Sequence, residues 1–303
     1  MRHIVESQQF TVPKILELFD RTELMKKIVA RGGTRDYENK IMASLFYKPS
    51  TRTRFSFESA MYRLGGKVLS TEQAMEFSSE IEGERLEDTI RIIANYCDVV
   101  VLRHHEEGGA KRAAAVSPVP IINAGDGSGG QHPTQALLDL YTIFNECKTL
   151  DGLSVAFVGA LDYGRTVRSL AYLLSKFDRV KLYFVAPKEI QIKPDIFEHL
   201  DEKGVSYQLL DNINDIIGKV DVVYQTRIER ERLENKQLDL TQYNINLDVL
   251  QKMKYNSIIM HPLPRSVEID HAVDADPRAA YFRQAQNGLY VRMALLTMIF
   301  DNN

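Results

Sequence analysis

The sequence predicts an α/β protein made of two doubly wound parallel-sheet domains joined by long helices. The chain has 303 residues, about twice the usual length of one domain. Apolar runs of strand length alternate with amphipathic segments of helix length from end to end, as in parallel α/β sheets. With 44% hydrophobic and 26% charged residues, the composition is that of an ordinary globular protein, which excludes disorder and collagen-like repeats.

The first domain is predicted to begin with a long helix. Proline suits the first turn of a helix and glycine its end, so this helix should begin near Val12–Pro13 and stop at Gly32–Gly33. Helical spacing places five apolar residues on its buried face: Ile15, Leu16, Phe19, Ile28 and Val29. The elements that follow are strands at Ile41–Phe46, Val99–Leu102 and Val119–Asn123, and helices at about Arg54–Leu64 and Leu86–Tyr96.

A helix predicted from Pro133 to about Cys147 leads to the second domain. Asp151-Gly152 interrupts the pattern there, which places a boundary near residue 150. The strands predicted next are Ser154–Val158, Lys181–Val185, Val205–Leu210, Val220–Tyr224 and Ser257–Met260. We therefore assign residues 1–132 to the first domain and 150–284 to the second. A final helix, about Gln284–Ile299, is expected to pack back on the first domain as part of residues 285–303.

The charge balance and the cysteine count exclude several classes of protein. With 38 Lys+Arg against 41 Asp+Glu, the net charge is -3 and the pI about 6.2, so no basic field draws the chain to nucleic acid. Only two cysteines, Cys97 and Cys147, are present, which indicates neither a disulfide framework nor a metal cluster. No apolar run reaches the roughly 18 residues of a membrane span, and residues 1–6 lack a signal-peptide core. We therefore expect a cytoplasmic protein with no membrane partner.

Polar residues gather directly after the predicted strands. In open α/β sheets, ligands bind outside the carboxyl ends of the strands, so a site is expected there. The segments concerned are Ser50–Arg54, Arg103–His105, Gly125–Gln135, Arg165, Arg227 and His261–Arg265.

Ser50-Thr51-Arg52-Thr53 lies between a strand and a helix, where hydroxyls and backbone N–H groups converge on a helix N-terminus and favour an anion. Arg52 can grip phosphate oxygens in a bidentate manner that lysine cannot reproduce. Ser and Thr before a helix are also ordinary N-caps. The spacing by itself therefore leaves phosphate binding and simple capping both open.

His132 and Gln135 flank Pro133 at the start of a predicted helix, so that an imidazole and an amide could face one ligand. A helix N-terminus favours the neutral imidazole, which can donate a hydrogen bond to a carbonyl oxygen. A simple capping histidine is the alternative. His104 and His105 have no acidic partner at metal-ligand spacing, and we interpret them as non-ligands.

Together these motifs resemble the aspartate/ornithine carbamoyltransferase family. The resemblance covers most of the chain and rests on Ser50-Thr51-Arg52-Thr53-Arg54, His132-Pro133-Thr134-Gln135, Asp162-Tyr163-Gly164-Arg165-Thr166, Thr226-Arg227 and His261-Pro262-Leu263-Pro264-Arg265. Ornithine enzymes typically carry a cysteine in the last motif, where this chain has Pro262, so the aspartate branch is favoured. The resemblance implies transfer of the carbamoyl group of carbamoyl phosphate to L-aspartate, giving N-carbamoyl-L-aspartate and phosphate in pyrimidine biosynthesis.

The resemblance also implies a role for each motif. Residues 1–132 would bind carbamoyl phosphate and residues 150–284 the acceptor amino acid, without metal or cofactor. The phosphate would be held by Ser50, Thr51, Arg52, Thr53 and Arg103, with Arg103, Thr53 and His132 also polarising the carbonyl. Gln135 and the backbone carbonyls around Pro262 and Leu263 would fix the carbamoyl NH2, and Arg165 and Arg227 would bind the acceptor carboxylates.

The sequence departs from the family pattern in two places. Family members are homotrimers with shared active sites, in which a loop of the neighbouring chain supplies a serine and a lysine. Here that loop keeps Ser78, but Glu82 replaces the lysine and Arg85 replaces a hydroxyl residue. Glu229 stands where a glutamine commonly helps bind the acceptor. Both changes add negative charge, which leaves three readings open: an aspartate enzyme with local compensation, a carbamoyltransferase for another amino acid or amine, or a weakly active scaffold that binds carbamoyl phosphate. A regulatory chain or a pathway enzyme as further partner is also left open.

Overall fold

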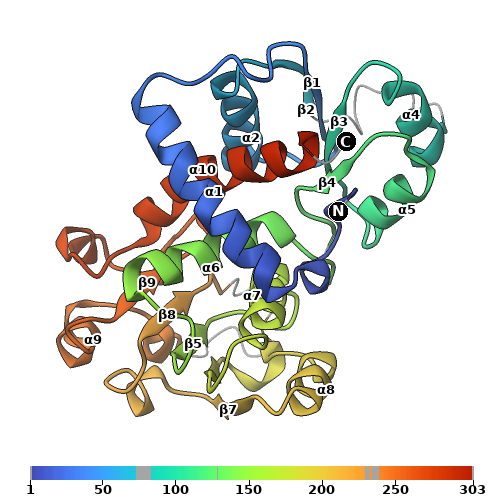
Figure 1. Ribbon diagram of the computed structural model, residues 1–303. Helices are drawn as coiled ribbons and strands as arrows, with labels where there is room; N and C mark the ends of the chain where they lie inside the picture. Colours follow the sequence, from blue (N-terminus) through green and yellow to red (C-terminus); the bar gives the residue numbers. More distant parts are fainter. Residues whose placement is uncertain (1, 73–82, 128, 229–232, 234–238, 302–303) are drawn as a thin grey trace. The chain divides into compact units, whose positions relative to one another are not determined.

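The computed structural model describes residues 2–72, 83–127, 129–228, 233 and 239–301 (Figure 1). Its contacts divide the chain into two compact units. Unit 1 contains the residues up to Leu138 and those from Gln286 onward, and unit 2 contains Asp139–Ala285. Two long helices, α6 (Pro133–Cys147) and α10 (Tyr281–Phe300), have residues in both units.

Unit 1 is built on a four-stranded parallel sheet, sheet A, with the order β2-β1-β3-β4. Its strands are β1 (Ile41–Phe46), β2 (Lys67–Glu72), β3 (Val99–Arg103) and β4 (Ile121–Asn123). Among the described residues, the helices wholly within this unit are η1 (Ser7–Gln9), α1 (Val12–Ala30), α2 (Thr51–Arg63), α4 (Leu86–Ile93) and α5 (Gly109–Val116). Strands β1 and β3 are mostly apolar and mostly buried, as expected of central parallel strands.

Unit 2 is built on a five-stranded parallel sheet, sheet B, with the order β7-β6-β5-β8-β9. Its strands are β5 (Ser154–Val158), β6 (Lys181–Val185), β7 (Ser206–Leu210), β8 (Val222–Gln225) and β9 (Ile258–Met260). In the described part of this unit, the helices wholly within it are α7 (Arg165–Leu174), η3 (Lys188–Ile190), α8 (Pro194–Glu202), η4 (Ile213–Asp215), η6 (Thr241–Tyr243), α9 (Leu247–Lys252) and η7 (His271–Ala275). The predicted fold class of two parallel α/β units is confirmed.

The sequence prediction missed one strand of sheet A. Strand β2 pairs with β1 at the edge of the sheet. It reads Lys-Val-Leu-Ser-Thr-Glu, with only two apolar residues, so it lacks the continuous apolar run that marks a strand buried on both faces. The short helix α5 was missed as well, because its eight residues include four alanines and give little periodic signal.

The buried face of α1 also differs from the prediction. Ile15 and Phe19 are buried, but Leu16 is 45% exposed, and Ile28 and Val29 are only half-buried. The inward positions are taken instead by the residues Leu18, Thr22 and Met25, which with Ile15 recur at intervals of three and four along one helix face. The prediction that Leu16 lies on the buried face is therefore wrong.

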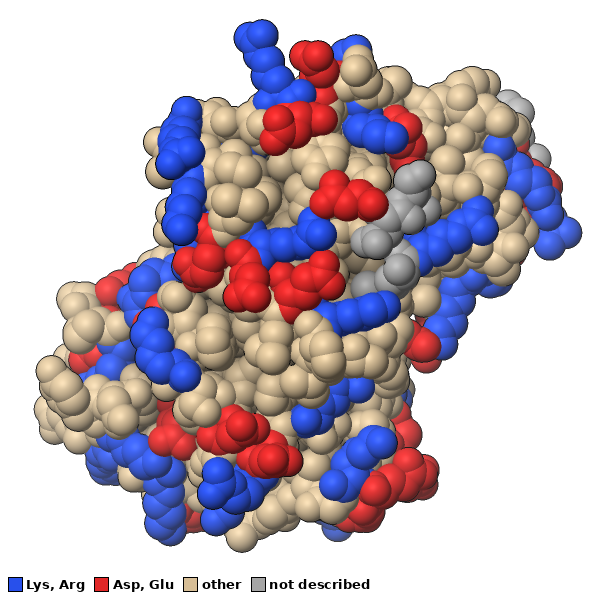
Figure 2. Space-filling model, viewed as in Figure 1, with Lys and Arg blue, Asp and Glu red and all other residues tan. Residues whose placement is uncertain are grey.

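The surface carries both signs of charge. On the face shown in Figure 2, Lys and Arg side chains are interspersed with Asp and Glu side chains. This agrees with the net charge of -3. No helix within the described residues is both long enough and apolar enough to cross a membrane.

Candidate active site

Each sheet has one switch point. This is the place between two neighbouring strands from which the chain adds its further strands toward opposite edges of the sheet. In sheet A it lies between β1 and β3, and in sheet B between β5 and β8. Ligands of open α/β sheets bind beyond the carboxyl ends of the strands at such points. The segments that leave these four strands carry most of the polar motifs singled out in the sequence.

The segment after β1 forms the N-terminus of α2. Ser50 is the N-cap residue, and its carbonyl accepts the N–H of Arg54 at 3.0 Å. Thr51, Arg52 and Thr53 form the first turn, whereas the sequence prediction placed them before the helix. Because N–H groups of a first turn have no acceptor inside the helix, they point toward the end of the helix and are available to an anion there. No acidic residue lies in this turn.

The two arginines of this turn have different surroundings. Arg54 lies 3.8 Å from Glu58, and Glu58 also accepts a hydrogen bond from the Ser44 hydroxyl at 3.0 Å. Arg52 makes no ion pair with any acidic side chain in the part of the chain that the structure describes. Its side chain reaches solvent, yet neighbouring protein atoms lower the pKa of its guanidinium by burial. An un-neutralised guanidinium at a helix N-terminus is suited to a phosphate group.

Strand register brings Arg103 to the same edge of sheet A. Arg103 ends β3 and lies opposite Phe46, the last residue of β1. The backbone N–H of Tyr47 donates to the Arg103 carbonyl at 2.9 Å, which fixes the two strand ends together. The Arg103 guanidinium donates to the carbonyl of Ala124 at 3.4 Å, so the side chain extends across the edge toward the end of β4.

The loop after β4 leads directly to His132. Asn123 anchors it, donating from its side chain to the Val5 carbonyl at 2.9 Å and accepting the N–H of Gly125 at 2.8 Å. The loop approaches its neighbours closely, because a Cβ atom at Gly127 would lie 2.2 Å from the His105 carbonyl oxygen. His132 is 4% exposed and precedes α6, where its carbonyl accepts the N–H of Gln135 at 3.0 Å.

The two histidines after β3 belong to an aromatic cluster with Tyr47. The His104 ring lies 5.0 Å from the Tyr47 ring, edge on, and 4.3 Å from the His105 ring. His104 is 1% exposed, and its Nδ1 accepts the backbone N–H of Glu106 at 3.1 Å. Burial first, and then the neighbouring His105, lower the pKa of His104 to about 4.

Acid should therefore weaken the fold through His104. The unfolded residue takes up a proton near pH 6.5, whereas the folded residue does so only at a pKa of about 4. Between these values the unfolded state binds more protons, so the free energy of unfolding falls as the pH drops, by at most about 3 kcal/mol. His104→Asn keeps an acceptor for the Glu106 N–H but does not titrate. Urea unfolding of both proteins from pH 7 to pH 4 should show a shallower decline for the variant; equal declines would contradict this assignment.

Thr226 and Gly159 hold the ends of β8 and β5 close together at the switch point of sheet B. The Thr226 hydroxyl donates to the Val158 carbonyl at 2.9 Å, joining the ends of β8 and β5. Gly159 has φ +116°, and a Cβ atom there would lie 2.3 Å from the Thr226 carbonyl oxygen, so the backbones approach as closely as only glycine permits. Arg165 follows as the first residue of α7, and Arg227 follows Thr226 and is exposed.

The segment after β9 is tied into unit 2 at both ends. His261 is 2% exposed, and its backbone N–H donates to the Gln284 side chain at 2.9 Å. Arg265 donates to Asp274 and, at 3.0 Å, to the Tyr281 hydroxyl. Pro262 and Leu263 lie between these anchors and are half-buried. Arg265 is therefore engaged in holding the segment.

Three residues singled out in the sequence, Ser78, Glu82 and Glu229, lie outside the described residues. Within each unit, the structure brings the others to the carboxyl edges of the strands. In unit 1 these are the first turn of α2 with Arg103 and His132, and in unit 2 they are the segments that carry Arg165, Arg227 and Leu263.

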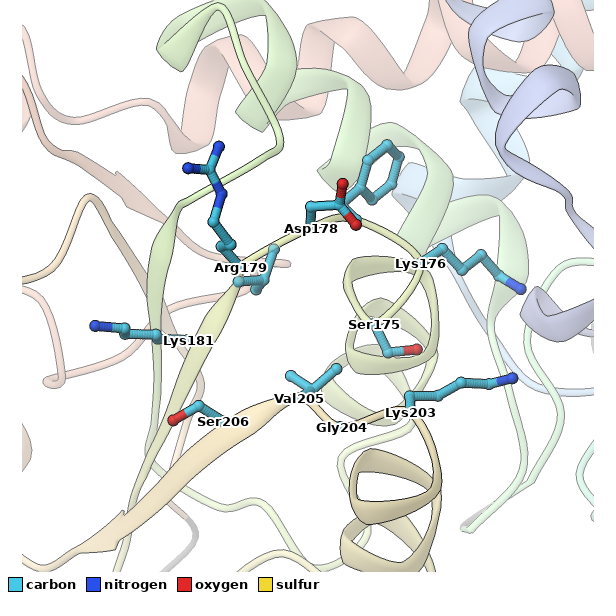
Figure 3. Close-up of a pocket in the computed structure, with 11 residues that line it drawn as sticks. Ser175, Lys176, Asp178, Arg179, Lys181, Lys203, Gly204, Val205 and Ser206 are labelled. Atoms are coloured by element: carbon cyan, nitrogen blue, oxygen red, sulfur yellow. The ribbon is translucent and has the colours of Figure 1, made fainter.

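A separate hollow of about 430 Å³ lies at the opposite, amino-terminal edge of sheet B (Figure 3). It is lined by Lys176, Arg179, Lys181 and Lys203 together with Asp178. Figure 3 shows Lys176 and Lys203 extending to one side of the hollow and Lys181 to the other, so the cationic groups do not converge. None of the sequence motifs lines it.

Among the described residues, neither a metal-binding cluster nor a reactive thiol is present. No group of three or more His, Cys, Asp or Glu side chains among them is placed to hold a metal ion. Both cysteines are free thiols, and burial raises the pKa of Cys97 and of Cys147 to about 11. They are therefore protonated at neutral pH and poor nucleophiles.

Sequence reasoning missed the buried residues that support these segments. Asp139 of α6 accepts from the Tyr224 hydroxyl and from the Gln284 side chain, each at 2.7 Å. Glu268 lies 2.9 Å from His261. For an isolated Asp, Glu or Gln in an amphipathic segment, the sequence predicts an exposed side chain. Only its contacts with distant parts of the chain show that it is buried.

Family models match both halves of the chain. The model described as "Aspartate/ornithine carbamoyltransferase, carbamoyl-P binding domain" matches residues 2–145. The model described as "Aspartate/ornithine carbamoyltransferase, Asp/Orn binding domain" matches residues 151–299.

Individual relatives are similar over nearly the whole chain. The chain is 53% identical over 302 residues to aspartate carbamoyltransferase 1, chloroplastic, of Pisum sativum, covering 98% of this chain and 78% of that protein. The solved catalytic subunit of Methanocaldococcus jannaschii aspartate transcarbamoylase is 45% identical, with a TM-score of 0.93 and coverage of 100% and 99% of the two chains. Trypanosoma cruzi aspartate transcarbamoylase in complex with carbamoyl phosphate and aspartate is 38% identical, with a TM-score of 0.92 and coverage of 97% and 94%.

Proposed function

The chain belongs to the aspartate/ornithine carbamoyltransferase family, and on that basis we propose that it transfers the carbamoyl group of carbamoyl phosphate to L-aspartate. The products are N-carbamoyl-L-aspartate and phosphate, an early intermediate and by-product of pyrimidine synthesis. The observation that carries the proposal is 53% identity across 98% of the chain to an aspartate carbamoyltransferase. The sequence-based resemblance to this family is confirmed.

The reaction is an aminolysis of an acyl phosphate. The α-amino group of aspartate attacks the carbonyl carbon, the C–O bond to phosphate breaks, and the departing phosphate takes the amine proton. Positioning of the two substrates and stabilisation of the charge on the carbonyl oxygen supply the rate enhancement. These steps need no redox change.

We propose that unit 1 binds carbamoyl phosphate. Ser50, Thr51 and Thr53 surround the N-terminus of α2, where the first-turn N–H groups and the helix dipole favour the phosphate. Arg52 is un-neutralised among the described residues, and Arg103 is held beside the end of β1 by strand pairing. His132, buried at the start of α6, donates to the carbonyl oxygen, and Gln135 one turn on binds the carbamoyl amide.

We propose that unit 2 binds the acceptor and orients the carbamoyl group. Arg165 and Arg227 bind the two aspartate carboxylates, for which guanidinium groups are well matched. The backbone carbonyls of Pro262 and Leu263 accept hydrogen bonds from the carbamoyl NH2. Glu229 takes part in acceptor binding in place of the glutamine that the family commonly has there.

The protein is further proposed to work as a homotrimer, with Ser78 and Glu82 reaching the site of a neighbouring chain. Helix α2 packs against the edge strand β2, and these two elements expose Phe55, Tyr62 and Leu69, each at least 49% accessible. Exposed apolar side chains on an edge strand and on the helix packed against it support a contact with a further chain. We infer a cytoplasmic location from the two unpaired thiols, which suit a reducing compartment.

An acceptor panel tests the proposed reaction. With carbamoyl phosphate as donor, L-aspartate should give a kcat/KM about 100-fold above that of L-asparagine, because asparagine cannot form the charged hydrogen bonds of the side-chain carboxylate with arginine. L-Ornithine and L-glutamine complete the panel, and product formation is measured by colorimetric detection of the ureido group. Turnover of ornithine or asparagine at rates equal to aspartate would instead support another acceptor selected by Glu82 and Glu229. No turnover with any acceptor would support a scaffold.

A further inference from the structure

The loop His261–Arg265 contains a residue in an unusual backbone conformation. Leu263 has φ +53°, in the left-handed region that residues with a Cβ atom rarely adopt. Such a conformation persists only where the surrounding structure holds it. Under the proposed function, the carbonyl of this same residue binds the carbamoyl NH2, so whatever holds Leu263 also aims a group that contacts the substrate.

His261 holds Leu263 from inside the unit. The Leu263 backbone N–H donates to Nδ1 of His261 at 2.8 Å. Because Nδ1 accepts this hydrogen bond, the ring proton is on Nε2 in the neutral imidazole. Nε2 lies 2.9 Å from Oε1 of Glu268, to which it donates. The chain of hydrogen bonds therefore runs from Glu268 through the imidazole to the backbone of Leu263.

Glu268 is itself firmly placed. It is 3% exposed, and the backbone N–H of Ser266 donates to both of its carboxylate oxygens at 3.1 Å. Its own carbonyl accepts the N–H of Ile245 at 2.9 Å, which joins it to a neighbouring segment. Burial alone would raise the pKa of Glu268, but the hydrogen bonds from His261 and Ser266 outweigh it and lower that pKa. The carboxylate is thus ionised and fixed as an acceptor.

The other anchors of the loop act on its ends. Gln284 accepts from the backbone N–H of His261 at 2.9 Å. Arg265 pairs with Asp274 and donates to the Tyr281 hydroxyl. Neither anchor reaches the Leu263 backbone. Among the described residues, the hydrogen bond from the Leu263 N–H to His261 is the side-chain contact that holds this peptide.

We propose that Glu268 is a positioning residue for amide recognition: through His261 it orients the Leu263 peptide, so that the site prefers a carbamoyl NH2 to other groups of similar size. This inference rests on the proposed function and adds to it a residue that makes no substrate contact. It explains why a carboxylate and an imidazole are buried together next to an otherwise apolar strand, β9, where burial of polar groups is costly.

Two stable ligands that differ in one group test the proposal. Phosphonoacetamide carries the NH2 group, and 2-oxopropylphosphonate carries a methyl group in its place, while the phosphonate and the carbonyl are the same in both. The quantity to measure is the ratio of their dissociation constants, by isothermal titration calorimetry. Glu268→Ala removes the acceptor for His261 and should lower the preference for the amide about tenfold, the effect of losing one to two hydrogen bonds. The affinity for 2-oxopropylphosphonate should stay within about twofold of wild type.

Further variants separate positioning from general stability. Glu268→Gln keeps an acceptor oxygen for Nε2 and should restore most of the preference. His261→Gln can place its amide nitrogen near the position of Nε2, as a donor for Glu268, but has no acceptor at the position of Nδ1 for the Leu263 N–H, so it should lose the preference as Glu268→Ala does. Glu146→Ala is the matched control: this glutamate of unit 2 pairs with Arg283 at 2.8 Å and, among the described residues, makes no hydrogen bond to the loop, so the preference should not change.

Kinetics give a second readout. In Glu268→Ala the KM for carbamoyl phosphate should rise about tenfold while the KM for aspartate changes less than about twofold. If the variants lost affinity for both phosphonates equally, the proposal would be overturned. An unchanged preference for the amide in folded Glu268→Ala and His261→Gln would overturn it as well. Equal binding of the two phosphonates by the wild type would also overturn it, whereas binding of neither, together with no turnover in the acceptor panel, would show that the proposed function itself fails.

Discussion

Arg52→Ala should lower kcat/KM for carbamoyl phosphate about a thousandfold. The side chain lies in the first turn of α2 and is un-neutralised by any acidic group among the described residues. A bidentate contact with phosphate comprises two charged hydrogen bonds of about 1.5–3 kcal/mol each, and their sum corresponds to roughly 10²–10⁴ in rate constant. Initial rates at varied carbamoyl phosphate, with aspartate held constant, measure this loss.

Two variants of helix α2 make the result specific. Arg52→Lys keeps the charge without the planar fork, so its loss should be intermediate. Arg63→Ala removes an arginine from the last turn of the same helix, where it donates to the Gly32 carbonyl at 3.2 Å, and should leave kcat/KM within about threefold. If Arg52→Ala were no worse than Arg63→Ala, the N-terminus of α2 would not be the phosphate site.

Asp139→Ala should reduce the free energy of unfolding by about 3 kcal/mol. Asp139 is fully buried and accepts from the Tyr224 hydroxyl and the Gln284 side chain, each at 2.7 Å. Without it, two buried donors lose their acceptor, at roughly 1–3 kcal/mol each. Gln284 also holds the backbone of His261, so the loss spreads to the loop after β9. Urea unfolding followed by far-UV circular dichroism measures the change.

Coupling with Tyr224 distinguishes this network from a general effect of truncation. Tyr224→Phe removes one donor, and in the Asp139→Ala background it should cost less than in the wild type, because the hydroxyl is already without its acceptor. Asp178→Ala, at an exposed position, should change stability by less than about 0.5 kcal/mol. Additive losses for Asp139→Ala and Tyr224→Phe would rule out the network as the source of stability.

The local pattern of the sequence was enough for the central elements. Strands β1, β5 and β6 and helix α6 have the predicted bounds, because the strands are mostly apolar runs of strand length and α6 begins at a proline and has a helical apolar pattern. Other element ends shifted. Helix α2 begins at Thr51, three residues before the predicted start, which changes Arg52 from a loop residue to a first-turn residue.

The candidate site also contains residues that the sequence predicted and residues that it did not. Residues that follow strands were found because parallel strands in an open sheet place their carboxyl ends at one edge, a rule that requires only the order of elements. The edge strand β2 was missed, since its mixed polarity differs from that of a buried strand. The supporting residues Glu268 and Asp139 were missed because their partners come from other elements of the fold.

Local residue patterns were sufficient to predict the α/β alternation, the family, and the motifs that carry arginine, histidine and hydroxyl groups to the strand ends. The strand order, the neighbours of Arg52, and the buried hydrogen bonds that fix the loops became known from the fold. The two sets of features differ in how far apart along the chain the interacting residues lie. Periodicity reports the environment of residues a few positions apart, whereas Asp139 meets Tyr224 and Gln284 from 85 and 145 positions away. No local pattern encodes such pairs, and chain folding alone brings them together.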